Sequence, residues 1–188
     1  GPIPSTTIDF WNMICKYNVK VIVMLAQCFE DGKNKCNAYW PDGEDVKFGT
    51  VKISLKSEKK YTHYTLRHLE VESLDKTMTV VQMQYVTWPD KGVPRNLSSI
   101  LSLWQKVSAH RKDNEFLVVH CSAGVGRTGT FIAMNYLMKQ LENEGSVDIL
   151  GCMSRLREDR PQMIQTLEQY KLCFSSILLH HLVGTTSI

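Results

Sequence analysis

The residues with the clearest chemical meaning are Cys121 and Arg127, which lie six positions apart with two glycines between them. The apolar residues 116–119 before the cysteine are typical of a buried strand. Apolar residues at helical spacing after it predict a helix that begins near Arg127 and ends at Gly145. Loop N–H groups between a strand and a helix N-terminus form an anion cradle, because they point inward and the helix dipole adds positive charge. The segment therefore predicts a site for a phosphate group.

The same cradle would hold Cys121 as a thiolate. A free cysteine has a pKa of ~8.5, and a helix N-terminus with a nearby arginine can lower it to roughly 3.5–7.5. A drop of about three units requires about 4 kcal/mol, and the helix dipole supplies at most about 2 kcal/mol. Loop N–H groups, the Thr128 hydroxyl and the Arg127 charge must supply the rest. Cys121 is therefore predicted to be a nucleophile at neutral pH.

Residues 120–131, His-Cys-Ser-Ala-Gly-Val-Gly-Arg-Thr-Gly-Thr-Phe, resemble the phosphate-binding loop of the cysteine-dependent protein tyrosine phosphatases. A bare Cys-x5-Arg motif also occurs in other folds, so the resemblance depends on the length of the match. A buried structural cysteine is the other interpretation, but it gives the glycines and the arginine no purpose. By resemblance, Cys121 forms a phosphocysteine and Arg127 binds the phosphate bidentately. The loop residues expected to bind substrate are Ser122, Ala123, Gly124, Val125 and Gly126, supported by His120 and Thr128.

A second motif, Trp88-Pro89-Asp90, continues through Gly92-Val93-Pro94. In the family it resembles, this is a mobile loop that closes over bound phosphotyrosine. The resemblance implies that Asp90 is the general acid that protonates the leaving phenolate oxygen, with Trp88 in support. An aspartate after proline is more commonly only a turn residue, but the presence of Cys121 favours the catalytic assignment.

Residues 164–170 are similar to the glutamine loop of the same family. The resemblance implies that Gln165 positions the water that hydrolyses the phosphocysteine, that Gln169 supports it, and that Asp90 then acts as a base. The alternative for Gln165 is an ordinary residue on a helix surface.

Three further supporting residues are assigned only by resemblance. Glu30 would pair with Arg127, Lys35 would approach Asp90 or the substrate, and Tyr39 would hydrogen-bond His120. Each could equally be a solvated loop residue or, for Tyr39, part of the core.

The composition is that of an ordinary soluble protein, with 188 residues, 43% hydrophobic, 22% charged and a net charge of +3. This small charge does not indicate nucleic acid, and no apolar stretch approaches the ~20 residues of a membrane helix. No secretory signal opens the chain, so a cytoplasmic protein, or a cytoplasmic domain of a longer one, is expected.

No Cys-x2-Cys pair is present among the six cysteines, which favours reduced thiols over disulfides or a metal site. No cofactor is expected, because the arginine and the loop amides meet the charge. The cysteines are Cys15, Cys28, Cys36, Cys121, Cys152 and Cys173.

The remaining pattern predicts an α/β fold, with a twisted mixed sheet, helices on both faces and the phosphate-binding loop between a strand and a helix. Apolar periodicity predicts the other elements. Helices are expected at 5–17, 97–112, 147–158 and 163–182, a buried strand at 19–26, a polar loop at 27–37, and antiparallel strands at 48–55, 61–71 and 78–86.

Residues 1–188 are predicted to form a single protein tyrosine phosphatase-like catalytic domain that is N-terminally truncated relative to the family. The resemblance runs from Gly1 to about Phe174. Family members carry further helices and a tyrosine-bearing recognition loop before this point, so either the chain is part of a longer parent or the product lacks that segment. Apolar surface left open there would be covered by a partner or by the missing segment.

Three functions are compatible with these residues. The first is hydrolysis of phosphotyrosine in proteins or peptides. The second is a phosphotyrosine-binding module with little or no turnover, although such a module need not keep Cys121, Asp90, Arg127 and Gln165. The third is a less selective phosphatase for phosphoinositides or for phosphoserine and phosphothreonine, although the loop lacks the extra lysines expected for inositol phosphates.

Overall fold

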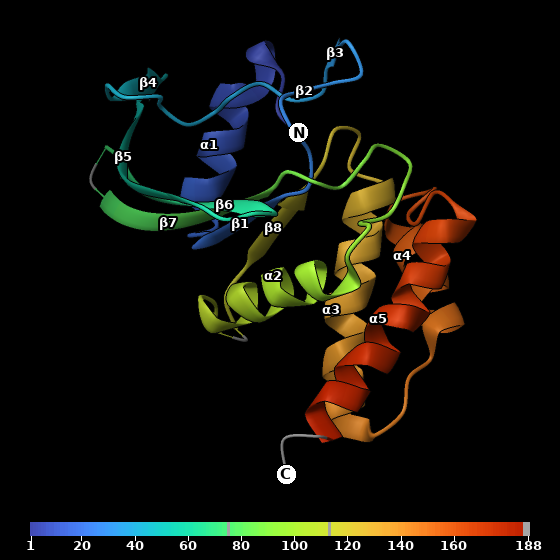
Figure 1. Ribbon diagram of the computed structural model, residues 1–188. Helices are drawn as coiled ribbons and strands as arrows, with labels where there is room; N and C mark the ends of the chain where they lie inside the picture. The colour runs from blue at the N-terminus through green and yellow to red at the C-terminus, as the bar shows by residue number, and fades with distance from the viewer. Residues whose placement is uncertain (75, 113, 186–188) are drawn as a thin grey trace.

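The computed structural model describes residues 1–74, 76–112 and 114–185 of the chain. A twisted mixed sheet has helices on both faces (Figure 1), which confirms the predicted α/β fold. The main sheet contains β1 (Val21–Met24), β4 (Val46–Phe48), β5 (Val51–Lys60), β6 (Tyr64–Ser73), β7 (Lys76–Tyr85) and β8 (Leu117–His120). A separate hairpin contains β2 (Phe29–Glu30) and β3 (Lys33–Asn34). After a 3₁₀ turn at Pro4–Thr6 the helices are α1 (Thr7–Lys16), α2 (Leu97–Ala109), α3 (Gly126–Glu144), α4 (Ile149–Asp159) and α5 (Leu167–Thr185).

The order of the strands in the sheet is β4-β5-β6-β7-β1-β8. Strands β4 to β7 are antiparallel, as predicted, whereas β1 is parallel to both β7 and β8. Parallel strands end at the same edge of a sheet, where open α/β folds place their sites. The chain therefore leaves β7, β1 and β8 at one edge and enters the three segments that hold Asp90, Glu30 with Lys35, and Cys121.

Two apolar cores lie on opposite faces of the sheet. Helix α1 covers one face and buries Trp11 and Ile14 against it. Helices α2 and α3 lie on the other face, and α5 packs against α3 (Figure 1). Phe131 of α3 is fully buried there. Because both faces are covered, all four residues of β1 are buried, which explains its continuous apolar sequence. No helix in the described part of the chain is both long enough and apolar enough to cross a membrane.

Several predicted boundaries are wrong for identifiable reasons. The predicted strand 48–55 is two strands, β4 and β5, separated by a turn at residues 49–50. The predicted buried strand 116–119 is instead the edge strand β8, and Phe116 precedes it with 62% of its surface exposed. The polar loop 27–37 contains the β2–β3 hairpin. An edge strand has one neighbour only, so an apolar sequence there does not ensure burial.

The helices also differ from the prediction in detail. The last helix begins at Leu167 rather than at 163, because Gln162 and Ile164 have positive φ values of 67° and 60° that a helix does not permit. Gln165 therefore lies in a loop, not on a helix surface. The predicted end of α3 at Gly145 is confirmed. Tyr136 has the apolar spacing of this helix but is 50% exposed.

Candidate active site

Cys121 lies directly after β8, at the edge where the three parallel strands end. Its side chain is 4% exposed, and the Thr128 hydroxyl donates a hydrogen bond to its Sγ at 3.1 Å. The loop that follows curls back because Gly124 adopts φ = 71°, a conformation that side chains other than glycine rarely adopt. Helix α3 then begins at Gly126, so its N-terminus faces the sulfur.

Cys121 is the one cysteine of the six whose pKa is lowered. Its burial acts to raise the pKa, but hydrogen bonds from the hydroxyl and N–H of Thr128 and from the N–H of Gly124, together with the Arg127 charge, outweigh that effect. Burial raises the pKa of each of the others, to about 12 for Cys36 and for Cys173. All six are free thiols. The loop thus distinguishes this sulfur electrostatically and not by exposure.

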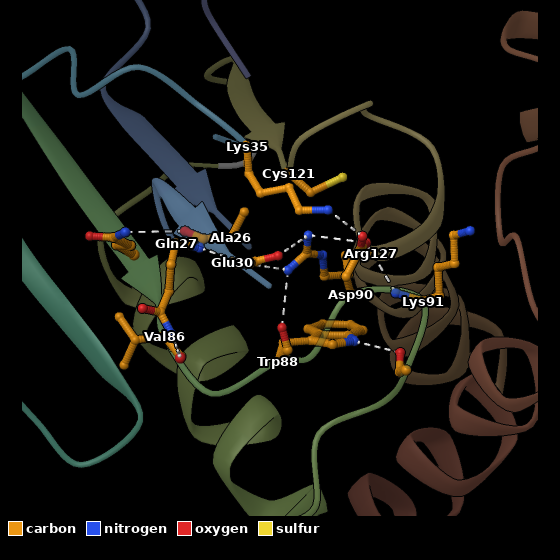
Figure 2. A network of polar contacts seen from close by, with 12 residues as sticks. Ala26, Gln27, Glu30, Lys35, Val86, Trp88, Asp90, Lys91, Cys121 and Arg127 are labelled. Carbon is orange, nitrogen blue, oxygen red and sulfur yellow. Dashed lines mark hydrogen bonds and ion pairs between the residues drawn. The ribbon is translucent and has the colours of Figure 1, made fainter. Parts of the chain in front are cut away.

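Arg127 is almost fully buried and lies at the centre of the polar contacts (Figure 2). Its two terminal nitrogens donate to the two Glu30 oxygens at 2.7 and 3.0 Å. One nitrogen also donates to the Trp88 carbonyl at 3.0 Å, and the other to Asp90 at 3.4 Å. A guanidinium has five N–H groups, and these four contacts use the four on the terminal nitrogens. Nε–H has no partner among these contacts, and the contact to Asp90 is the longest of the four. Both could turn to a bound phosphate while Glu30 keeps the guanidinium in its plane.

Asp90 lies between two cations in the segment after β7. Lys35 Nζ donates to Asp90 Oδ2 at 2.6 Å (Figure 2), and the Lys91 N–H donates to the other carboxylate oxygen at 3.1 Å. The hydrogen bond from Lys35 is the main cause that lowers the pKa of Asp90, and the charge on Arg127 adds to it against the effect of burial. Asp90 is therefore ionised at neutral pH without substrate. A nearby anion, such as a phosphate dianion, would raise its pKa toward that of a useful acid.

Replacement of Lys35 by methionine is expected to shift the alkaline limb of the kcat/KM profile to higher pH. This limb reports the acid in the free enzyme. Without the hydrogen bond and charge of Lys35, the carboxylate is less stabilised and its pKa rises toward the ordinary value, so the acid keeps its proton to higher pH. The profile is measured with a small aryl phosphate. Lys33→Met, on the same hairpin and exposed, is the control. An unmoved limb, or movement to lower pH, would contradict the assignment.

The loop that carries Asp90 is fixed at both ends. The side chain of Gln27 donates to the Val86 carbonyl at 2.9 Å. The Trp88 indole is buried and donates to the Gly92 carbonyl at 2.9 Å, and Gln169 donates to the same carbonyl at 3.3 Å. Trp88 and Gln169 thus hold this loop in place over Arg127. Their supporting roles in catalysis stay predictions.

The glutamine segment lies against the start of α3. A Cβ on Gly129 would lie 2.7 Å from the Ile164 backbone nitrogen, so only glycine permits this approach. The Gln165 N–H donates to Gln169 Oε1 at 2.9 Å, while the Gln165 side chain is exposed beside Gly126. Gln165 is therefore placed at the mouth of the loop.

Tyr39 and His120 form the contact that the family resemblance implies. The Tyr39 hydroxyl and His120 Nε2 are 2.8 Å apart, and His120 Nδ1 is 3.0 Å from the Cys121 carbonyl oxygen. Burial lowers the pKa of His120 to about 4, so its ring is neutral at pH 7.

Sequence reasoning missed one residue at the loop, Arg160. Its guanidinium donates to the carbonyls of Ala123 at 2.8 Å and Gly124 at 3.1 Å. Carbonyls held outward in this way leave the adjoining N–H groups free to face an anion. Arg160 precedes a proline and lies just beyond the helix expected at 147–158, and its sequence context contains no signal for this role.

Comparison with known proteins gives one consistent result. A family model described as protein-tyrosine phosphatase matches residues 1–179. Receptor-type tyrosine-protein phosphatase eta from Gallus gallus is 41% identical over 175 residues, which cover 90% of this chain and 12% of that protein. Phosphatidylinositol phosphatase PTPRQ from Homo sapiens is 41% identical over 181 residues, or 95% of this chain and 8% of that protein. The chain therefore spans only a small part of these relatives.

A solved structure shares the fold over nearly the whole chain. It is described as the structural basis of the PTPN18 fingerprint on distinct HER2 tyrosine phosphorylation sites, and it superposes with a TM-score of 0.92 at 32% sequence identity. The match covers 96% of this chain and 66% of the other.

Proposed function

Because the chain belongs to the protein tyrosine phosphatase family, we propose that it hydrolyses phosphotyrosine in proteins through a phosphocysteine intermediate. One observation supports this most strongly. Cys121, whose pKa is lowered, lies beside Arg127, and Arg127 in turn contacts Asp90. A nucleophile, a phosphate-binding cation and an acid are thus brought together at one edge of the sheet, as the chemistry requires.

In the first step the Cys121 thiolate attacks phosphorus and the bond from phosphorus to the phenolic oxygen breaks. Asp90, protonated once the phosphate dianion is bound, transfers its proton to that oxygen. Nε–H of Arg127 and the N–H released from Asp90 bind two non-bridging oxygens, and N–H groups of residues 122–127 bind the same phosphate. The products of this step are the dephosphorylated tyrosine and a phosphocysteine.

In the second step a water molecule attacks the phosphocysteine. Gln165 positions the water, the Asp90 carboxylate accepts its proton, and the bond between sulfur and phosphorus breaks to release inorganic phosphate. The Thr128 hydroxyl, 3.1 Å from the sulfur, stabilises the thiolate as it leaves. Glu30 holds Arg127, and Lys35 holds Asp90, through both steps. No metal or organic cofactor takes part in this scheme.

Burial of the nucleophile favours phosphotyrosine as substrate. Cys121 is only 4% exposed, and a phosphotyrosyl side chain extends further from its backbone than a phosphoseryl one. The relationship to PTPN18, whose structure concerns HER2 tyrosine phosphorylation sites, supports the same substrate class. We further propose that residues 1–188 act as one catalytic domain in the cytoplasm, where its thiolate stays reduced.

A second candidate is a phosphoinositide phosphatase, because one relative at 41% identity is named a phosphatidylinositol phosphatase. A panel of substrates tests both functions. Phosphate release is measured from a phosphotyrosine peptide, the matching phosphoserine peptide and a short-chain phosphoinositide. We expect kcat/KM to be highest for the phosphotyrosine peptide by at least roughly tenfold, a difference of about 1.4 kcal/mol. A preference for the phosphoinositide would favour the second candidate, and binding of the phosphotyrosine peptide without release would indicate a binding module.

A further inference from the structure

Four buried polar side chains form a hydrogen-bonded chain from the middle of the sheet to the backbone of Cys121. Its members are Arg67, Gln82, Tyr39 and His120. Arg67 of β6 donates to Gln82 Oε1 of β7 at 2.9 Å, and Gln82 Nε2 donates to the Tyr39 hydroxyl at 2.9 Å. The Tyr39 hydroxyl is hydrogen-bonded to His120 Nε2, and His120 Nδ1 is hydrogen-bonded to the Cys121 carbonyl oxygen. Gln82 and Tyr39 are fully buried, and Arg67 and His120 are 7% and 6% exposed. Polar groups at this depth require partners, so each link restricts the next.

The direction of every hydrogen bond in this chain is fixed by its two ends. Arg67 can only donate and a carbonyl oxygen can only accept. Gln82 Oε1 therefore accepts from Arg67, and its amide nitrogen donates to the Tyr39 oxygen. Nδ1 of His120 must carry the proton that the Cys121 carbonyl oxygen accepts, so Nε2 of the neutral ring accepts from the Tyr39 hydroxyl.

Arg67, the first member of this hydrogen-bonded chain, is itself held by several contacts. Arg67 Nε donates to Glu58 at 2.7 Å, and the Arg67 guanidinium lies 4.4 Å from the centre of the Trp40 ring. Gln84 Oε1 accepts from the same nitrogen that serves Gln82, at 2.9 Å. The cation is therefore compensated and cannot turn away from Gln82.

We propose that Gln82 and Arg67 are positioning residues for Cys121, and that they act through Tyr39 by holding His120 as the neutral tautomer with its proton on Nδ1. Aligned hydrogen bonds in a low-dielectric interior polarise one another. A bond to the Cys121 carbonyl oxygen polarises the peptide unit that carries the Ser122 N–H, and so strengthens a donor in the anion cradle. The effect on catalysis rests on the proposed function, whereas the tautomer does not.

The decisive variant is Gln82→Glu, which keeps the shape of the side chain but cannot donate. Its carboxylate would still accept from Arg67 and would also accept a hydrogen bond from the Tyr39 hydroxyl. Nε2 of His120 would then have to carry a proton in order to donate to the Tyr39 oxygen. Gln82→Leu lacks both functions and leaves Tyr39 free to donate to His120. If Gln82 only filled space, the leucine variant would be the more disruptive of the two.

Gln84→Glu is the matched control for charge. Gln84 is buried on the same strand, accepts from the same Arg67 nitrogen and donates to the Ala26 carbonyl instead of to Tyr39. In the sheet it is in register with Met24, which is in register with His120. A carboxylate at position 84 is at least as near to His120 along the sheet as a carboxylate at position 82, but it lies outside the hydrogen-bonded chain.

Two readouts that do not need phosphatase activity test the proposal. The first is the ¹⁵N NMR signature of the His120 ring, assigned with a His120→Asn variant. The second is the pH dependence of Cys121 alkylation by iodoacetamide, with folding checked by circular dichroism. We expect Nδ1–H with a bare Nε2 in the wild type, in Gln82→Leu and in Gln84→Glu, but a protonated Nε2 in Gln82→Glu. We also expect about tenfold slower alkylation at pH 6 for Gln82→Glu, which corresponds to about one pKa unit.

Three results would overturn the proposal: a proton on Nε2 in the wild type, equal alkylation rates in Gln82→Glu and Gln84→Glu, or a larger effect of Gln82→Leu than of Gln82→Glu. Lack of phosphatase activity with the expected tautomers would instead reject the proposed function and leave the positioning chain in place.

Discussion

Replacement of Cys121 by serine is expected to abolish turnover of a phosphotyrosine peptide while the peptide still binds. A hydroxyl does not ionise in the cradle at neutral pH, so the nucleophile is lost, and loss of a nucleophile lowers kcat by roughly 10⁴-fold or more. Arg127 and the loop N–H groups remain, so the phosphate still has its partners. Turnover is measured by phosphate release and binding by calorimetry.

Cys15→Ser is the matched control for this variant. Cys15 lies on α1, is half-buried, and has a pKa that burial raises, so it has none of the features of an activated thiol. We expect wild-type turnover in Cys15→Ser. Substantial turnover in Cys121→Ser would show that the chemistry does not depend on Cys121. Loss of turnover in both variants would show that the effect is not specific to this thiol.

The second large effect is expected for Asp90→Asn. The amide cannot protonate the leaving oxygen, and general acid catalysis contributes roughly 10²–10⁴-fold to a rate. The loss should be greatest for phenols with a high pKa, because their anions leave only with a proton. It should be small for a nitrophenyl phosphate, whose anion is stable. The alkaline limb of the pH profile should also disappear, since deprotonation of Asp90 causes it.

Asp31→Asn provides the control for loss of a nearby carboxylate. Asp31 is exposed in the turn of the β2–β3 hairpin with φ = 50°, a conformation that asparagine also adopts. We expect the Asp31→Asn variant to leave kcat, the dependence of kcat on the leaving group, and the alkaline limb of the pH profile unchanged. If Asp90→Asn slowed all leaving groups equally, Asp90 would have a role in binding and not in proton transfer.

The catalytic segment could be predicted from the sequence because its geometry is local. Residues 120–131 are contiguous, and their order of strand, glycine-containing turn and helix already places the sulfur at a helix N-terminus. The sequence predicted the antiparallel strands and the end of α3 for the same reason, since short-range periodicity and a terminal glycine specify them. It could not specify that β8 is an edge strand, because strand order depends on partners distant in the chain.

The resemblance to a family predicted the partners of this segment, and the tertiary structure supplies the reason they meet. Glu30, Lys35 and Asp90 come from segments that follow β1 and β7, which are parallel neighbours in the sheet, and β1 also pairs in parallel with β8. Parallel strands deliver their following segments to one edge of the sheet. The contacts of Arg127 with Glu30 and Asp90 therefore follow from topology and not from any local pattern.

By itself, the sequence determined the candidate nucleophile, the cradle around it and the α/β class, because these depend on neighbours within a few residues. The tertiary structure alone decided that Arg160 contacts that cradle and that Arg67 and Gln82 are linked to it by hydrogen bonds through Tyr39 and His120. In a strand, alternation distinguishes two faces but does not tell which of them other elements will cover. Gln82 looks like a solvent-facing residue in the sequence, yet it is fully buried, because α1 covers one face of the sheet and α2 and α3 cover the other.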